Sequence, residues 1–307
     1  MRKKNNNSDF KLRYFLYTFI GYTLFTTIFI IQFFIFTPIS VILHFIGIDN
    51  NKLFFTYATK LSCRSFFLAF IGHKININLK EIKAPKKGEK RLYLLNHSSI
   101  YDVIMSYLLP GPSKFIIKDK WVKKPFIGWM QGLAGNIVVG EEKDSNEAND
   151  TSLNAIQKTL DAFNRGISII VFPEGTRSDN GMIQRFKRGS FKIALDAECD
   201  LVPVVMDDWN TIRPTGLMIR DIKPVVKLIQ PIKYSQYSHL THIELAKLIR
   251  YIMAKELYAI REERKQKEKN YYRNDEKYAQ EDLQAKEELE KIKADLDAKN
   301  ISLKALN

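Results

Sequence analysis

The chain has 307 residues, of which 45% are hydrophobic, and a formal net charge of +14. This hydrophobic content excludes a mostly disordered protein and suffices for one large domain or two modest ones. The two cysteines, Cys63 and Cys199, match no metal or redox spacing, so we expect free thiols and no disulfide framework. The positive charge lies before Lys255, because the residues from there onward carry equal numbers of basic and acidic side chains. Such a charge suits nucleic acid, an anionic bilayer or a phosphorylated small molecule as the partner.

Residues 14–48 form an apolar and aromatic segment without a charged side chain. This pattern indicates a membrane segment and favours a bilayer partner over nucleic acid, for which no recognition motif is present. One straight helix of this length would measure about 50 Å, whereas the hydrocarbon core is about 30 Å thick. We therefore expect a break at Thr37-Pro38, because proline lacks the amide donor and disfavours helix in the residue before it. A cleaved signal peptide is the alternative, but it would have a shorter apolar region and a small-residue cleavage site.

Five basic side chains within the first 13 residues predict that the N-terminus stays on the cytoplasmic side. A single crossing would export the rest of the chain, so we expect a re-entrant hairpin that leaves the rest on the cytoplasmic face. Residues 53–71 predict a further helix with Lys60 and Arg64 one turn apart, as in a helix at the headgroup level. An ordinary amphipathic helix packed on the domain would show the same pattern.

The region after the membrane segment has the organisation of a globular domain. Residues 80–90, lysine-rich and containing Pro85 and Gly88, predict a linker. Beyond it, apolar runs alternate with helical patterns, which predicts an α/β fold with a mixed, largely parallel sheet flanked by helices. We divide the chain into an N-terminal membrane anchor (1–79, a helical hairpin plus an amphipathic helix), a globular domain (80–239) and a C-terminal helical, charged tail (240–307).

A histidine and an aspartate follow the apolar run 92–95, in the sequence NHSSIYD at residues 96–102. His97 and Asp102 would lie about 140° apart around an α-helix, so the helix must begin between them if the side chains are to meet. Ser99 is a suitable N-cap, which places Asp102 in the first turn and leaves His97 in the preceding turn. The pair predicts a general base with a carboxylate partner, and a helix cap with an incidental histidine is the alternative.

A second motif, Glu174-Gly175-Thr176-Arg177, follows the apolar run 167–172 in the same way. Glycine permits a tight turn, and the planar guanidinium of arginine is suited to a phosphate. An exposed turn with surface charges is the alternative. Ligands of parallel sheets bind at the carboxyl ends of strands, where both motifs fall, so together they predict a site that deprotonates a hydroxyl while holding an anionic substrate.

The C-terminal region begins with a helical pattern whose apolar positions run from Ile243 to Met253 and becomes densely charged from Glu262 to Asp297. No regular heptad seam continues beyond Tyr271, so we expect a solvated single helix or a weak coiled coil, with self-association through this helix as a further prediction.

In order and spacing, the histidine–aspartate motif, the Glu174–Arg177 turn, the sequence FKRG at 186–189 and the sequence VPVV at 202–205 resemble the glycerolipid acyltransferase family. The resemblance covers residues 92–232 and is strongest to the 1-acylglycerol-3-phosphate acyltransferases. It implies that residues 80–239 are a catalytic domain that moves a fatty acyl group from acyl-CoA or acyl-carrier protein to the sn-2 hydroxyl of lysophosphatidic acid, giving phosphatidic acid in phospholipid biosynthesis. These thioesters are co-substrates, and no cofactor or metal is implied.

The resemblance also assigns roles to the motif residues. His97 would take the hydroxyl proton, and Asp102 would orient the imidazole. Glu174, Gly175 and Thr176 would shape the acceptor pocket. Arg177 would contact the phosphate of the acceptor. Ser98 as a covalent nucleophile is an alternative that the adjacent position disfavours.

One departure concerns the acceptor, because Glu141 stands where the family commonly places an arginine, and Lys143 supplies only a point charge nearby. Acylation of another lysolipid or of glycerol 3-phosphate is therefore the alternative within the same chemistry. A non-catalytic scaffold on the membrane surface is the alternative from another class.

Overall fold

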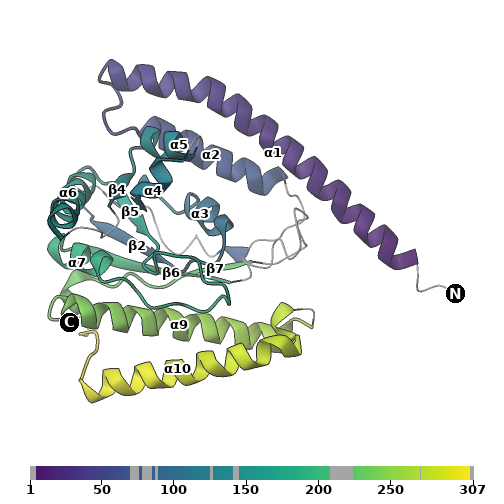
Figure 1. The fold of residues 1–307 in the computed structure, drawn as a ribbon, viewed down its shortest axis with the longest axis vertical. Helices are drawn as coiled ribbons and strands as arrows, with labels where there is room; N and C mark the ends of the chain where they lie inside the picture. The colour runs from purple at the N-terminus through teal and green to yellow at the C-terminus, as the bar shows by residue number, and fades with distance from the viewer. Residues whose placement is uncertain are drawn as a thin grey trace.

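The structure is a computed structural model that describes residues 5–69, 76–77, 85–86, 89–124, 127–140, 145–207, 224–269 and 271–304. In these ranges a seven-stranded sheet has the order β1-β7-β6-β2-β5-β3-β4 (Figure 1). All paired strands are parallel except β6 and β7, so the predicted mixed, largely parallel sheet is confirmed. The strands are β1 (Asn76–Ile77), β2 (Arg91–Leu95), β3 (Ser113–Lys118), β4 (Ile137–Val139), β5 (Ser168–Val171), β6 (Asp200–Asp207) and β7 (Val225–Leu228).

Helices cover both faces of this sheet (Figure 1). They are α1 (Asn5–Phe45), α2 (Leu53–Ala69), α3 (Ile100–Ser106), α4 (Asp119–Val122), α5 (Ile127–Leu133), α6 (Ser145–Asn164), α7 (Gly189–Asp196), α8 (Tyr234–Tyr237), α9 (His242–Lys267) and α10 (Ala279–Ala298). Two short 3₁₀ helices, Tyr272–Asn274 and Glu276–Tyr278, connect α9 to α10.

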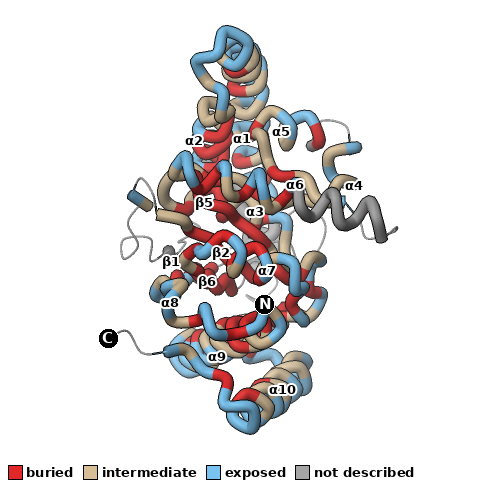
Figure 2. Tube along the Cα trace, turned by 90° about the vertical axis from the view of Figure 1, so that its left-hand side faces the viewer, coloured by how far each residue is buried: buried red, intermediate tan, exposed pale blue. Residues whose placement is uncertain are grey.

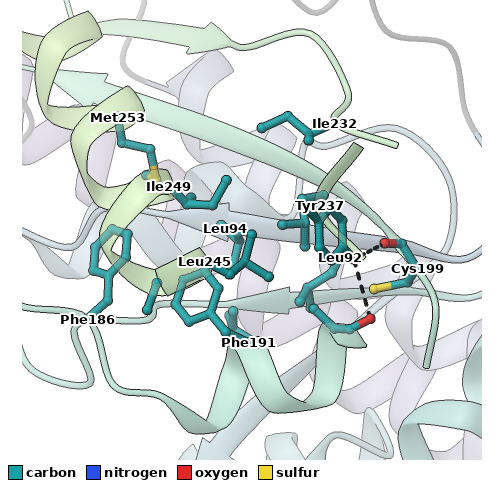
Figure 3. Close-up of a cluster of buried hydrophobic side chains, with 14 of the residues drawn as sticks. Leu92, Leu94, Phe186, Phe191, Cys199, Ile232, Tyr237, Leu245, Ile249 and Met253 are labelled. Carbon is teal, nitrogen blue, oxygen red and sulfur yellow. Dashed lines mark hydrogen bonds between the residues drawn. The ribbon is translucent and has the colours of Figure 1, made fainter. Parts of the chain in front are cut away.

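The core has two parts because successive side chains of a strand point to opposite faces. Leu92 and Leu94 of β2 belong to one buried cluster, whereas Tyr93 and Leu95 belong to the other. The first cluster includes side chains of α6, α7 and α9, and Figure 3 draws part of it. The second lies under α2 and α3. The tube in Figure 2 accordingly shows the central strands as buried.

Helix α1 differs from the prediction. It runs without interruption through Pro38, so the expected break at Thr37-Pro38 is wrong. A proline inside a helix removes one hydrogen bond, and neighbouring helices and local adjustment can compensate for that loss. The chain reverses at residues 46–52 instead, where Gly47 has a φ of +76° and the Asp49 carboxylate accepts hydrogen bonds from the amides of Leu53 and Phe54, both at 2.8 Å. The re-entrant hairpin expected within residues 14–48 is therefore not formed, and the reversal joins α1 to α2 instead.

The apolar stretch of α1, Thr18–Phe45, is long and apolar enough to cross a membrane, with a mean hydropathy of 2.2. Most of its large apolar side chains are exposed, for example Phe34 and Phe45. Tyr22 contacts the domain, since its hydroxyl lies 3.3 Å from that of Tyr101 in α3. An exposed apolar surface of this kind is typical of a helix that contacts a membrane or another apolar partner.

Helix α2 packs on the domain, as expected for an ordinary amphipathic helix and not for a helix at the headgroup level. Lys60 is buried, and its ammonium donates hydrogen bonds to the carbonyls of Leu109 at 2.8 Å and Gly111 at 2.5 Å. Burial lowers the pKa of Lys60 to about 8. Arg64, one turn on, is exposed. Lys60 is therefore not a headgroup contact.

The C-terminal region is a pair of antiparallel helices (Figure 1). Helix α9 covers one face of the sheet and buries Ile249 and Met253 in the first core cluster (Figure 3). The predicted boundary at residue 240 thus falls in front of a helix that packs with the sheet. The long charged helix is present as α10, which folds back on α9 and buries Leu289 and Leu296. Self-association through it stays a prediction.

Candidate active site

The two sequence motifs meet at one edge of the sheet. Strands β2 and β5 are parallel neighbours, with Leu94 opposite Val171, so their carboxyl ends lie side by side. His97 follows the first strand by two residues, and Glu174 follows the second by three. The amide of His97 donates a 2.7 Å hydrogen bond to Glu174 Oε1, and the amide of Ser178 donates a 2.7 Å bond to the carbonyl of His97. These contacts join the motifs directly.

The side chains of His97 and Asp102 form the centre of the site. Helix α3 begins after Ser99, which is its N-cap, and Asp102 completes a capping box at the third helical position. Asp102 Oδ2 accepts hydrogen bonds from the amides of Ser98 at 2.6 Å and Ser99 at 2.7 Å, and lies 3.1 Å from His97 Nδ1. The helix cap and the predicted base–carboxylate pair are thus the same arrangement, not competing ones.

The imidazole of His97 is held so that one nitrogen is left for chemistry. Its ring packs against Phe172, with centroids 4.4 Å apart, and the side chain remains 16% exposed. Asp102 is fully buried, and its Oδ1 has no hydrogen-bond partner in the part of the chain that the structure describes. When Nδ1–H donates to Asp102, the lone pair of Nε2 can accept a proton, and the buried carboxylate stabilises the resulting imidazolium.

Glu174 supports the backbone of the site and does not contact the imidazole through a hydrogen bond. Its two oxygens accept from the amides of His97 and Gln184, the latter at 2.9 Å. The side chain is buried, and burial raises its pKa to about 7, although both amide hydrogen bonds favour the ionised form. The arrangement fixes the position of His97 relative to the turn after β5.

The rest of the turn is open to solvent. Gly175 has a φ of +72°, a conformation that disfavours any residue with a Cβ atom. Thr176 and Arg177 are exposed, and the Arg177 guanidinium has no hydrogen-bond or ion-pair partner among the described residues. A Cβ atom on Gly175 would lie 2.8 Å from Lys187 Cε, so a second cationic side chain lies close to the turn. An anionic group at this turn would therefore meet two cationic side chains, Arg177 and Lys187.

Sequence reasoning missed several supports of the site. Asn96 holds the first motif on β6, since its side chain exchanges hydrogen bonds with the carbonyl and amide of Met206 at 2.9 and 2.7 Å. Phe172 and Ser178, which contact the ring and the backbone of His97, flank the second motif. Their only signal in the sequence is adjacency to the motif residues. Glu141 and Lys143, on which the doubt about the acceptor depends, lie outside the described residues, as does most of the predicted linker 80–90.

The chain is similar to known acyltransferases. Residues 75–207 match the family model described as Acyltransferase. The chain is 31% identical over 183 residues to the 1-acyl-sn-glycerol-3-phosphate acyltransferase of Escherichia coli, a match that covers 58% of this chain and 72% of that protein. It is 31% identical over 144 residues to the chloroplastic 1-acyl-sn-glycerol-3-phosphate acyltransferase LPAT1 of Arabidopsis thaliana, covering 47% of this chain.

Other similarities bear on length and fold. A relative from Chlamydomonas reinhardtii with the same enzyme name is 29% identical, and the matches span 42% of that protein and 39% of the Arabidopsis protein. The chain thus spans about two fifths of the length of these relatives. The crystal structure of the 1-acyl-sn-glycerophosphate acyltransferase from Thermotoga maritima superposes with a TM-score of 0.61 at 21% identity, over 82% of this chain and 97% of that chain. This likeness supports the fold.

Proposed function

Because the chain belongs to the 1-acyl-sn-glycerol-3-phosphate acyltransferase family, we propose that it transfers a fatty acyl group from an acyl thioester to the sn-2 hydroxyl of lysophosphatidic acid, giving phosphatidic acid. The observation that carries the proposal is the pairing of His97 with buried Asp102 beside a turn that exposes the guanidinium of Arg177. A base and a cation at one edge fit an acceptor that has both a hydroxyl and a phosphate.

The proposed reaction needs no covalent intermediate with the protein. His97 Nε2 takes the proton of the acceptor hydroxyl as its oxygen attacks the thioester carbonyl, and Asp102 stabilises the imidazolium. The tetrahedral intermediate then collapses with cleavage of the carbon–sulfur bond. The leaving thiolate takes the proton back from His97, which regenerates the base and releases a free thiol. Either acyl-CoA or acyl-carrier protein can supply the thioester.

We also propose that the catalytic domain lies on the cytoplasmic face, with α1 embedded along the bilayer. Two contacts support this placement, because Tyr22 meets Tyr101 of α3 while Phe36 packs on Phe54 of α2 with ring centroids 5.8 Å apart. A helix that lies along the domain instead of crossing the bilayer keeps the chain on the side from which it entered. Trp121 and Trp129, exposed after the carboxyl end of β3, are suited to the interface level at the same sheet edge as His97. Protease protection of a C-terminal tag in sealed vesicles of known orientation tests the placement.

The experiment that tests the function is product analysis by mass spectrometry. Purified full-length protein is supplied with acyl-CoA or acyl-carrier protein and with lysophosphatidic acid, glycerol 3-phosphate or an unphosphorylated lysolipid. We expect phosphatidic acid as the main product, and Arg177→Ala should raise the KM for lysophosphatidic acid. Preference for an unphosphorylated acceptor would favour the alternative suggested by Glu141. Absence of product with every pair, from protein with intact His97, would contradict catalysis and favour the scaffold.

A further inference from the structure

Three arginines of the C-terminal helical region reach the loop that follows the Glu174–Arg177 turn. This loop, residues 178–186, contains no helix or strand. Arg250 of α9 donates to the carbonyls of Ile183 and Gln184, both at 3.0 Å. Arg261 of the same helix donates to the carbonyl of Gly181 at 2.7 Å, and Arg273 to that of Asn180 at 2.9 Å. Since the loop lacks secondary structure, these guanidinium groups satisfy backbone carbonyls that would otherwise need water.

The arginines are themselves fixed by acidic partners and burial. Arg250 pairs with Glu288 of α10 at 2.6 Å and has a side chain only 15% exposed. The side chains of Arg261 and Arg273 are 7% and 0% exposed and pair with Asp207 and Asp282, respectively. Burial alone would raise the pKa of Asp207, but the guanidinium groups of Arg261 and Arg264 and the Tyr271 hydroxyl together lower it. Charge-assisted hydrogen bonds from buried, paired arginines hold a backbone more firmly than solvated ones do.

The same loop is bonded to the catalytic histidine. The amide of Gln184, whose carbonyl Arg250 holds, donates to Glu174, and the other oxygen of Glu174 accepts from the amide of His97. At the other end of the loop, the amide of Ser178 donates to the carbonyl of His97. Phe186 ends the loop in the first core cluster, beside Ile249 and Met253 of α9 (Figure 3). A continuous set of contacts therefore runs from α9 through the loop to both peptide groups of His97.

We propose that Arg250 is a positioning residue for acceptor binding, through which the helical pair α9–α10 holds the 178–186 loop and thereby the turn that carries Arg177. This role rests on the proposed function, because it is measured as the affinity of the protein for the acceptor. Covering the hydrophobic core would not require this role, because the guanidinium of Arg250 binds backbone carbonyls of the loop and not apolar side chains. The charged helix pair, which the sequence marks only as a tail, is thus part of the acceptor site's support.

The chain offers a matched control for this proposal. Lys247, one turn before Arg250 on α9, forms an ion pair with Asp295 of α10, so Lys247→Ala removes a comparable link between the same helices without touching the loop. In Arg250→Ala we expect the KM for lysophosphatidic acid to rise about tenfold, because small misplacements of a binding group weaken binding strongly. The kcat and the KM for the acyl donor should change less than about threefold, because Asp102 still orients the ring of His97. Arg250→Lys should restore part of the loss as a single donor.

Hydrogen–deuterium exchange supplies a readout that does not depend on activity. Peptides covering 178–186 should exchange faster in Arg250→Ala than in the wild type, whereas those of Lys247→Ala should not. Equal kinetic changes in both variants, or unchanged loop exchange in Arg250→Ala, would overturn the positioning role. If the wild type transfers no acyl group, the proposed function fails on its own, and the exchange data still decide whether Arg250 holds the loop.

Discussion

The turns after β2 and β5 each contain a buried carboxylate that accepts two backbone amide hydrogen bonds, yet the two groups do different work. Asp102 sits at the first turn of α3, takes both bonds on Oδ2 and directs the same oxygen at the ring of His97. Glu174 divides its bonds between two segments, His97 and Gln184, and reaches only the backbone. The comparison shows that His97 is positioned twice, through its ring by one carboxylate and through its peptide by the other. Substitutions that affect the two carboxylates separately can test this division.

The largest effect should follow removal of the group that both carboxylates position. We expect His97→Ala to lower kcat on the order of 10²- to 10⁴-fold, the usual contribution of a general base. Thermal stability should change little, because the ring is partly exposed and Asp102 keeps its two backbone amide bonds. Steady-state kinetics on purified protein measures the loss, and activity close to the wild type would exclude His97 as the base.

Asp102→Asn should come next in size, because it removes the charge beside His97 and can keep the contacts on one oxygen. All three contacts of Asp102 fall on Oδ2, and Oδ1 has no partner among the described atoms. Asparagine can keep an oxygen at the Oδ2 position, which preserves the helix cap, while its amide group takes the buried Oδ1 position, where no partner is found among the described atoms. We expect kcat to fall on the order of 10²-fold, because the imidazolium loses its counter-charge.

The control for Asp102→Asn is the melting temperature. A large drop in Tm would assign part of the loss of kcat to disturbed packing at α3 in addition to the lost charge. An unchanged kcat with an unchanged Tm would show that the ring of His97 needs no charged partner.

Glu174→Gln tests the second carboxylate through the pH dependence of stability. Burial raises the pKa of Glu174 from 4.5 to about 7, so the folded state holds this proton more tightly than the unfolded state. The stabilisation that comes from protonated Glu174 is therefore complete below pH 4.5 and is lost as the pH rises through 7. The free energy of unfolding falls by at most about 3 kcal/mol over this range. Glutamine does not titrate, so the decline between pH 5 and pH 8 should be smaller in the variant. Thermal unfolding in detergent at both pH values measures the difference, and parallel pH profiles would contradict it.

The same two carboxylates show which contacts can be predicted from the sequence and which cannot. The Asp102 contact joins residues five apart, and the N-cap preference of Ser99 fixes where the helix begins, so local rules predict it. The role of Glu174 depends on Gln184 and on a neighbouring strand, and nothing local indicates either partner. The α/β alternation was likewise local and predicted the sheet, because each strand and helix carries its own apolar pattern.

One prediction was wrong, and one set of contacts was not predicted. Pro38 predicts a break in α1, yet the helix continues through it, and the chain reverses at Gly47 and at the capping carboxylate of Asp49. The charged C-terminal pattern gave no sign that Arg261 and Tyr271 close on Asp207 at the end of β6. Long-range pairs of this kind carry no periodicity along the chain, so pattern analysis assigns their residues to a solvated surface.

The smallest effect is expected for Ser98→Ala, which separates direct attack by the acceptor from a covalent acyl-enzyme. The amide of Ser98 binds Asp102, and this bond survives loss of the side chain. No hydrogen bond joins the Ser98 hydroxyl to another of the described residues, so the base is not aligned to activate it. We expect kcat to change less than about threefold, under ~0.7 kcal/mol in the barrier. A burst of free thiol released without acceptor, absent in Ser98→Ala, would instead establish the acyl-enzyme, and the imidazole held by Asp102 would then activate a serine of the protein itself.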